Sequence, residues 1–115
     1  MSMKLSRTSR FEAAHKLPNH KGKCKNLHGH TYILEISVEG KVSKEGIVID
    51  FCEIDNLVRE SVINTLDHSY LNEIIENPTA ENISLWVWSK LKTKLNLCEI
   101  KLWETPDSCV TYSGK

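Results

Sequence analysis

Apolar and polar side chains alternate along the first third of the chain, as expected of strands covered on one face. The alternation is partial over residues 3–15, and the side chains that share its apolar face are Phe11, Ala13 and His15. It is clearest from residue 28 to residue 42, where one face carries His28, His30, Tyr32, Leu34, Ile36 and Val38. Residues 16–27 are rich in turn formers and are predicted to be a loop. The apolar run GIVIDF at 46–51 predicts a short buried strand or a strand extension.

Helical spacing of apolar residues follows in the second half of the chain. Residues 52–64 are predicted to be a helix, with an apolar stripe of Ile54, Leu57, Val58, Val62 and Ile63. After a connector, a second helix is predicted to open at Pro78 and Thr79, with Thr79 as its N-cap. Glu81 in its first turn suits the helix dipole. The apolar positions of this helix recur at four-residue steps, at Ile83, Val87, Leu91 and Leu95.

The chain ends as a strand at 97–105, a tight turn and a last short strand. The order strand, strand, helix, helix, strand, strand predicts an α+β fold. We expect a four-stranded antiparallel sheet with both helices on one face. A length of 115 residues favours a single domain over residues 1–115.

Composition narrows the classes of function. The 15 basic and 15 acidic residues cancel, which argues against a nucleic-acid-binding or membrane-binding protein. No run approaches the ~20 apolar residues of a membrane helix. No signal peptide is visible and the four cysteines show no paired spacing, so we expect a cytoplasmic protein with reduced thiols. Three of the cysteines, Cys52, Cys98 and Cys109, are predicted to be buried packing residues.

Three histidines form a candidate metal site. His28 and His30 lie two apart on one strand, so their side chains project from the same face. If the first two strands form a hairpin, His15 faces His28 across the pair. Three histidines with an open fourth position are the catalytic zinc pattern. The alternatives are a chance pair on a surface strand and an ordinary core or loop histidine at 15, and His20 is predicted to be a loop histidine.

Cys24 admits two interpretations. It is either a fourth ligand, which would close a structural site, or a free thiolate beside the metal. Lys23 and Lys25 on either side favour the thiolate form. Lysines at 16, 21, 23 and 25 are either a solvated loop or a rim that binds anions. The spacing of the residues leaves both questions open.

Two further positions carry candidate chemistry. Asp67 and His68 are adjacent in an apolar-flanked connector, where an aspartate can orient a histidine for proton transfer, or can simply cap backbone donors. Glu104 ends the last long strand on the face of Ile100 and Leu102. If it is buried, it needs a ligand that donates two hydrogen bonds in a fork; otherwise it is exposed at the strand end.

Six motifs, in order and spacing, resemble one family: FEAAH, CKNLHGHTY, GIVIDF, LDHSYLN, PTAEN and WET. They are similar to those of the pterin synthases of the tunnelling fold, which include 6-pyruvoyl-tetrahydropterin synthase and the 6-carboxy-5,6,7,8-tetrahydropterin synthase of queuosine biosynthesis. The resemblance runs from residue 5 to about residue 112. It implies that the sheets of several subunits join into a barrel, as a homotrimer or homohexamer, with active sites between subunits.

The resemblance also implies roles for individual residues. The zinc ligands would be His15, His28 and His30, and Cys24 would be a catalytic thiol outside the metal shell. Asp67 and His68 would complete the proton relay. Glu104 would anchor the pterin ring, with Thr105 as a helper beside it.

Within the family, three residues separate Cys24 from the HGH motif, which resembles the carboxy-type enzyme. The implied substrate is 7,8-dihydroneopterin triphosphate. A pyruvoyl-type synthase is the alternative within the family, and a non-enzymatic metal-binding module is the alternative outside it. A third group of the family carries a glutamate in the cysteine loop and releases a hydroxymethyl pterin; the loop here has none.

Overall fold

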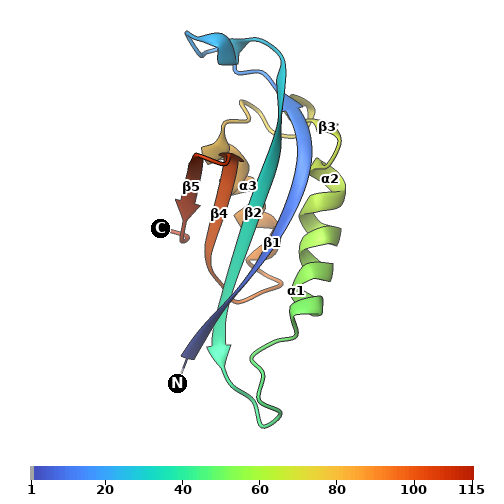
Figure 1. Cartoon of the computed structure of the whole chain (residues 1–115), viewed down its shortest axis with the longest axis vertical. Helices are drawn as coiled ribbons and strands as arrows, with labels where there is room; N and C mark the ends of the chain where they lie inside the picture. Colours follow the sequence, from blue (N-terminus) through green and yellow to red (C-terminus); the bar gives the residue numbers. More distant parts are fainter. Residues whose placement is uncertain (1) are drawn as a thin grey trace.

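A long β-hairpin dominates the computed structural model, which describes residues 2–115 (Figure 1). Strands β1 (Ser2–His15) and β2 (His28–Lys41) pair antiparallel along their whole length. The register sets His15 directly opposite His28. Both strands predicted from the alternation are confirmed, and the hairpin brings together histidines that are 13 residues apart.

Three further strands complete the sheet. β4 (Leu97–Thr105) pairs with β2, and β5 (Ser108–Tyr112) pairs with β4. At the other edge β3 (Ser69–Tyr70) runs parallel to β1, which gives the order β3-β1-β2-β4-β5. The prediction of four strands is therefore wrong by one. A strand of two residues is too short for alternation to reveal it.

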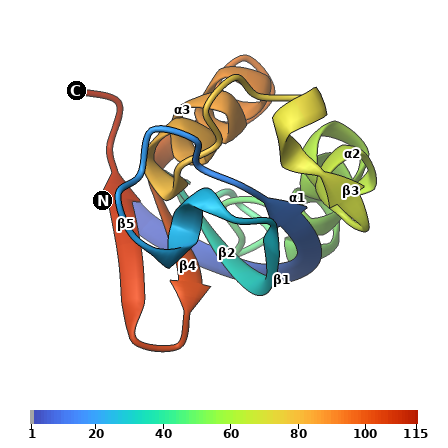
Figure 2. The ribbon, with the colours of Figure 1, turned by 90° about the horizontal axis from the view of Figure 1, so that it is seen from above.

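The helices cover one face of this sheet, as predicted (Figure 2). The first helical segment consists of α1 (Phe51–Val58), a π-helical turn η2 (Arg59–Ile63) and α2 (Asn64–Leu66). The second is α3 (Ala80–Leu91), and short 3-10 turns occur at η1 (Lys23–Lys25) and η3 (Leu71–Glu73). Both predicted apolar stripes pack into the core, whose fully buried members include Tyr32, Leu34, Ile36, Ile54, Val58, Ile83, Val87 and Ile100. None of the helices within residues 2–115 is long and apolar enough to cross a membrane.

The start of α3 confirms the predicted cap. The Thr79 side chain accepts a hydrogen bond of 3.1 Å from the Asn82 backbone N–H, and Glu81 lies in the first turn. The cap holds one of the four backbone donors that a helix start leaves free. The preceding residue, Pro78, is buried, and its carbonyl oxygen lies 2.8 Å from Nδ1 of His15.

The prediction of a buried strand at 46–51 is wrong. A turn at 44–45 leads into bends and irregular backbone over 46–50, and Phe51 begins α1. Gly46 takes a φ of +86°, which favours glycine, and Asp50 accepts a hydrogen bond of 2.8 Å from the Cys52 N–H as the N-cap of α1. The turn and the cap interrupt the run, and they leave the side chains of Ile47 and Phe51 about half exposed, at 52% and 47%.

Two of the three cysteines predicted to be buried are exposed. Cys52 lies on the solvent side of α1, and Cys109 lies on β5 opposite Trp103. Trp103 belongs to the face of the sheet that the helices leave uncovered, since its neighbour Leu102 points into the core. Only Cys98 is partly buried, and burial raises the pKa of its thiol.

Candidate metal centre and active site

Three histidine side chains meet at one end of the β1–β2 hairpin. Their ligand atoms all lie within 4.8 Å of one another, and Nε2 of His15 is 3.0 Å from Nε2 of His28. His15 is fully buried, whereas His28 and His30 are partly exposed. The predicted juxtaposition of His15, His28 and His30 is confirmed, and the geometry allows them to hold a metal ion.

The hydrogen bonds around the cluster fix the tautomers of two of its members. The Nδ1–H of His15 donates to the Pro78 carbonyl at 2.8 Å, and the Nδ1–H of His28 donates to the Asn26 carbonyl at 2.7 Å. Carbonyl oxygens only accept, and a neutral imidazole carries a single N–H. Both Nε2 atoms therefore present lone pairs to each other across 3.0 Å. That arrangement is unfavourable unless a cation lies between them.

The third member points to the same conclusion. Within residues 2–115, Nε2 of His30 is the buried side-chain polar atom without a hydrogen-bond partner. Such atoms are rare because burying an unpaired polar group costs free energy. One metal ion bound by the three Nε2 atoms would satisfy all of them, so the residues present fit a three-histidine metal site.

The two carbonyl groups that orient His15 and His28 were not predicted. Partners of this kind set the tautomer and the ring direction of metal-binding histidines. Backbone carbonyls leave no mark in the sequence, because every residue has one. Only the fold shows that the capped start of α3 carries the Pro78 carbonyl to His15.

Glu104 lies against the cluster. Its carboxylate oxygens are 3.8 Å from Nε2 of His30 and 3.9 Å from Nε2 of His15, and its side chain is 27% exposed. Burial lowers the pKa of His30, and the Glu104 carboxylate opposes that shift. Burial thus favours the neutral form of the His30 ring, which is the form that binds a metal.

A cavity of about 340 Å³ opens beside these residues. His30, Glu104 and Thr105 are among the residues that line it, so both candidate substrate-binding residues lie beside one member of the histidine cluster. Arg10 and Trp103 also line it, and neither was predicted, because no motif marks them. Their positions follow from the strand register, which sets Arg10, Ile33 and Trp103 in one row across β1, β2 and β4.

Cys24 belongs to the loop beyond the ends of β1 and β2 (Figure 1). Its carbonyl accepts a hydrogen bond of 2.8 Å from the Leu17 N–H, which folds the loop back towards His15. The side chain is partly buried, and the cluster of ligand atoms among residues 2–115 does not include its thiol. The four lysines of the loop are all exposed.

Asp67 and His68 lie at the outer edge of β1, on the side away from β2, and their hydrogen bonds hold them to that strand. One Asp67 oxygen accepts a hydrogen bond of 2.9 Å from the Glu12 N–H, and the other lies 3.0 Å from Nδ1 of His68. The bond from Glu12 is the main reason why the pKa of Asp67 is lowered. The His68 N–H donates to the Glu12 carbonyl, and His68 takes a positive φ of 58°. Both predicted functions of Asp67, capping a backbone donor and holding a histidine, therefore have their contacts here.

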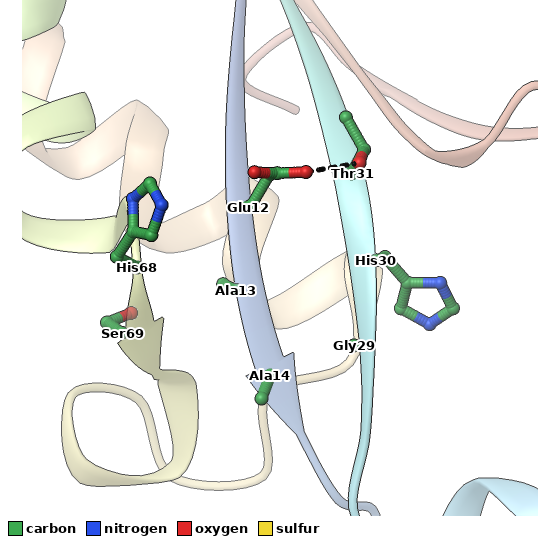
Figure 3. A pocket seen from close by; sticks show the side chains of 8 residues that line it. All are labelled: Glu12, Ala13, Ala14, Gly29, His30, Thr31, His68 and Ser69. Carbon is green, nitrogen blue, oxygen red and sulfur yellow. Dashed lines mark hydrogen bonds between the residues drawn. The ribbon is translucent and has the colours of Figure 1, made fainter.

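One chain does not bring the His68 ring to the metal site. Figure 3 shows His68 on the β3 side of the hairpin and His30 on the far side of β2, with its ring pointing away from His68. Both line one hollow of about 520 Å³, yet the β1–β2 pair separates the two rings. The His68 side chain is 78% exposed, so it is free to meet another molecule.

The fold and this cluster define an α+β protein with three histidines placed to hold a metal ion. A sequence profile of the 6-pyruvoyl tetrahydropterin synthase family matches residues 4–115, and the chain belongs to this family. It is 44% identical over 98 residues to a putative 6-carboxy-5,6,7,8-tetrahydropterin synthase of Archaeoglobus fulgidus, with 84% of each chain covered. It is 41% identical over 98 residues to a dihydroneopterin monophosphate aldolase of Pyrococcus furiosus, with 82% of each covered.

A solved structure supports the same assignment. The 6-pyruvoyl tetrahydropterin synthase of Caenorhabditis elegans superposes with a TM-score of 0.90 at 28% identity, covering 100% of this chain and 97% of that one. The predicted tunnelling-fold architecture is thereby confirmed. The names of the three similar proteins refer to three different activities. Family membership therefore establishes a pterin-synthase-type enzyme, and the particular reaction is a separate question.

Proposed function

We propose that the protein converts 7,8-dihydroneopterin triphosphate to 6-carboxy-5,6,7,8-tetrahydropterin, with release of acetaldehyde and triphosphate. The reaction would be a cytoplasmic step of queuosine biosynthesis. The observation that carries the proposal is the short Cys24 loop, in which three residues separate the thiol from the first histidine of HGH. The 44% identity to a relative named for this product supports it.

We propose Zn²⁺ as the metal, held by His15, His28 and His30. When bound, it would supply Lewis acidity to the side-chain hydroxyls of the substrate. The chain's own residues have three other tasks, which are to position the pterin, to bind the triphosphate and to move protons.

Positioning would fall to the cavity beside the metal site. The Glu104 carboxylate has two oxygens in one plane, and the 2-amino-pyrimidinone edge of a pterin presents two N–H donors with matching geometry. Thr105 lines the same cavity and would contact the ring beside it. The exposed lysines at 21, 23 and 25 would meet the triphosphate.

Proton transfer would fall to Cys24, His68 and Asp67. Cys24 would remove a proton from the substrate side chain as a thiolate base. His68 would exchange protons with the reacting centre through Nε2, because Asp67 holds its Nδ1 at 3.0 Å. Asp67 stays ionised in this role, since its pKa is lowered.

We propose that a second copy of the chain supplies His68 to each site, in a homotrimer or homohexamer. Two observations support this proposal. His68 and His30 lie on opposite sides of the hairpin in one chain (Figure 3). Within residues 2–115, strand β3 pairs only with Ala13 and Ala14, and Asp67 and His68 bond the Glu12 backbone, so the outer edge of β1 before Glu12 is available to a strand of a neighbouring copy.

The test is anaerobic incubation of the zinc-loaded protein with dihydroneopterin triphosphate, with the products read by mass spectrometry. The proposal predicts a 6-carboxy-tetrahydropterin together with acetaldehyde. The same incubation with dihydroneopterin monophosphate is the matched control, and it is expected to give no product. The Cys24→Ala variant with zinc bound tests whether the product depends on the thiol.

Two other products would point elsewhere in the family. A 6-pyruvoyl product would favour the activity named for the Caenorhabditis elegans structure. Cleavage of the monophosphate would favour the aldolase activity named for the Pyrococcus furiosus relative, which is 41% identical. No turnover of either substrate with zinc bound would favour a non-enzymatic metal-binding module. A cobalt-substituted spectrum would then show whether Cys24 is a ligand, since thiolate ligation gives a strong charge-transfer band.

A further inference from the structure

We infer that the Glu104 carboxylate is a fourth protein ligand of the metal while no substrate is bound, and that pterin binding takes it off the metal. The inference rests on the metal site of the proposed function, and it gives Glu104 a second role. In the structure the carboxylate lies against the histidine cluster, 3.8 Å from Nε2 of His30 and 3.9 Å from Nε2 of His15.

The spacing of the donor atoms supports direct ligation. Two donors of one tetrahedral zinc, each ~2.0–2.1 Å from the ion, lie about 3.4 Å apart. Nε2 of His15 and Nε2 of His28 are 3.0 Å apart, slightly closer than this value. Oε1 of Glu104 is 3.8 Å from Nε2 of His30, and Oε2 is 3.9 Å from Nε2 of His15, both slightly farther than this value. A small rotation of the Glu104 side chain would therefore bring one of its oxygens into coordination distance.

The surroundings of the carboxylate leave it available. Its ion-pair contacts within residues 2–115 are His15 and His30 alone. Both are ligand candidates whose Nε2 atoms face the metal position, so neither can donate a proton to Glu104 when a metal is bound. A largely buried carboxylate without a donor is costly. A metal ion bound by the three histidines would be the nearest positive charge to the Glu104 carboxylate.

The consequence is a switch between two partners. A carboxylate that binds a metal through one oxygen cannot also accept two parallel hydrogen bonds from the edge of a 2-amino-pyrimidinone. The N–H groups of the pterin would draw Glu104 away and open the fourth metal position for the substrate side chain. The metal would thus stay closed to other ligands until a molecule with this donor pattern enters the cavity.

Zinc affinity tests the inference without using turnover. The wild type, Glu104→Gln, Glu104→Asp and Glu12→Gln are compared by competition with a chromogenic chelator. Loss of an outer partner of a metal site typically costs ~10–100-fold in affinity, so loss of a direct ligand in Glu104→Gln should cost roughly 100-fold or more. Glu12→Gln removes the same charge from the same end of the sheet and should change affinity less than about threefold, because exposed charges are screened.

Glu104→Asp separates ligation from a simple field effect. It keeps the charge but shortens the side chain by one methylene, so the carboxylate no longer reaches the ion. Ligation predicts that this variant binds zinc as weakly as Glu104→Gln. Wild-type affinity in Glu104→Asp would overturn the inference, since charge alone would then suffice.

The cobalt-loaded protein gives a second readout. Unsubstituted pterin, which has the donor edge but no hydroxylated side chain, should shift the visible spectrum of the wild type towards that of cobalt-loaded Glu104→Gln, and it should leave the variant's spectrum unchanged. A wild-type spectrum that neither pterin nor the substitution alters would overturn the inference and leave the proposed function standing. If the wild type itself failed to bind zinc or cobalt, both would fall together.

Discussion

The three-histidine cluster and the Asp67–His68 pair lie at the same end of the sheet, yet they are built in different ways. The cluster includes a fully buried histidine, is oriented by two backbone carbonyls and is complete within one chain. The pair is fixed to the edge of β1 by its backbone and by Asp67, while the His68 ring is 78% exposed. Under the proposed function, the metal ligands would be in place within one chain, and His68 would act only in the site of a second molecule.

The difference separates two kinds of pre-organisation. Burial fixes the metal ligands, because an unpaired Nε2 atom in the core is costly unless an ion is present. The backbone and Asp67 hold His68, whose ring has no other polar partner within residues 2–115. Substitutions in the histidine cluster should therefore abolish metal binding, whereas substitutions of Asp67 or His68 should reduce turnover and leave the metal bound.

The largest expected effect follows from removing a metal ligand. His28→Ala leaves two nitrogens where the site needs three, so the variant should retain no zinc after dialysis and show no turnover. Elemental analysis of the dialysed protein measures this directly. His20→Ala, in the exposed loop, is the matched control and should keep its zinc. Equal zinc in the two variants would contradict the assigned site.

Removing the Cys24 thiol should abolish turnover without affecting zinc binding. Cys24→Ala is expected to bind zinc like the wild type and to lose turnover by ~10²–10⁴-fold, the usual contribution of a general base. Cys109→Ala, an exposed cysteine on β5, is the control and should remain active. Loss of zinc from Cys24→Ala would mean that the thiol is a ligand after all.

The lowered pKa of Asp67 predicts a moderate, pH-dependent effect on stability. A carboxyl whose pKa is lower in the folded than in the unfolded chain stabilises the fold above its ordinary pKa of about 4, and this stability is lost as the pH falls through the lowered value. Asp67→Asn should therefore lower the Tm at pH 7, and the gap to the wild type should close below about pH 4. Thermal melts from pH 2.5 to 7 test this. A gap that widens in acid would contradict the assigned cause.

The smallest effect concerns the shell around the ligands. Thr79→Ala removes the N-cap of α3 and should cost about 1 kcal/mol of stability. Zinc affinity should also fall, by less than about tenfold, because the neighbouring Pro78 carbonyl orients His15. Ser89→Ala, whose hydroxyl bonds within the same helix, should change neither quantity appreciably. If the two variants behaved alike, the cap would have no part in holding the site.

The alternation of side chains predicted most of this arrangement. In β1 and β2 the period-two pattern also carries the histidines, so the residues that define the strands define the metal ligands. Thr79 marked the start of α3 because its hydroxyl caps the helix. Such features depend on residues that are close together in the chain, so they can be predicted from the amino-acid sequence.

What the sequence did not show depends on distant contacts. Strand β3 exists because Ser69 and Tyr70 pair with β1, more than 50 residues earlier, and not because of their own pattern. GIVIDF looks like a strand, but Gly46 and Asp50 bend and cap it. The carbonyls of Asn26 and Pro78, and the approach of Glu104 to His15 and His30, depend on the complete fold.

A subunit-mixing experiment tests the central claim most directly, which is that each site takes its metal and thiol from one chain and His68 from another. Cys24→Ala and His68→Ala chains, each inactive alone, are unfolded together and refolded with zinc, and turnover of dihydroneopterin triphosphate is measured. Each variant refolded alone is the control. The account predicts that the mixture regains a measurable fraction of wild-type activity, because some mixed sites combine an intact Cys24 with an intact His68. A mixture that forms mixed oligomers but stays inactive would contradict it.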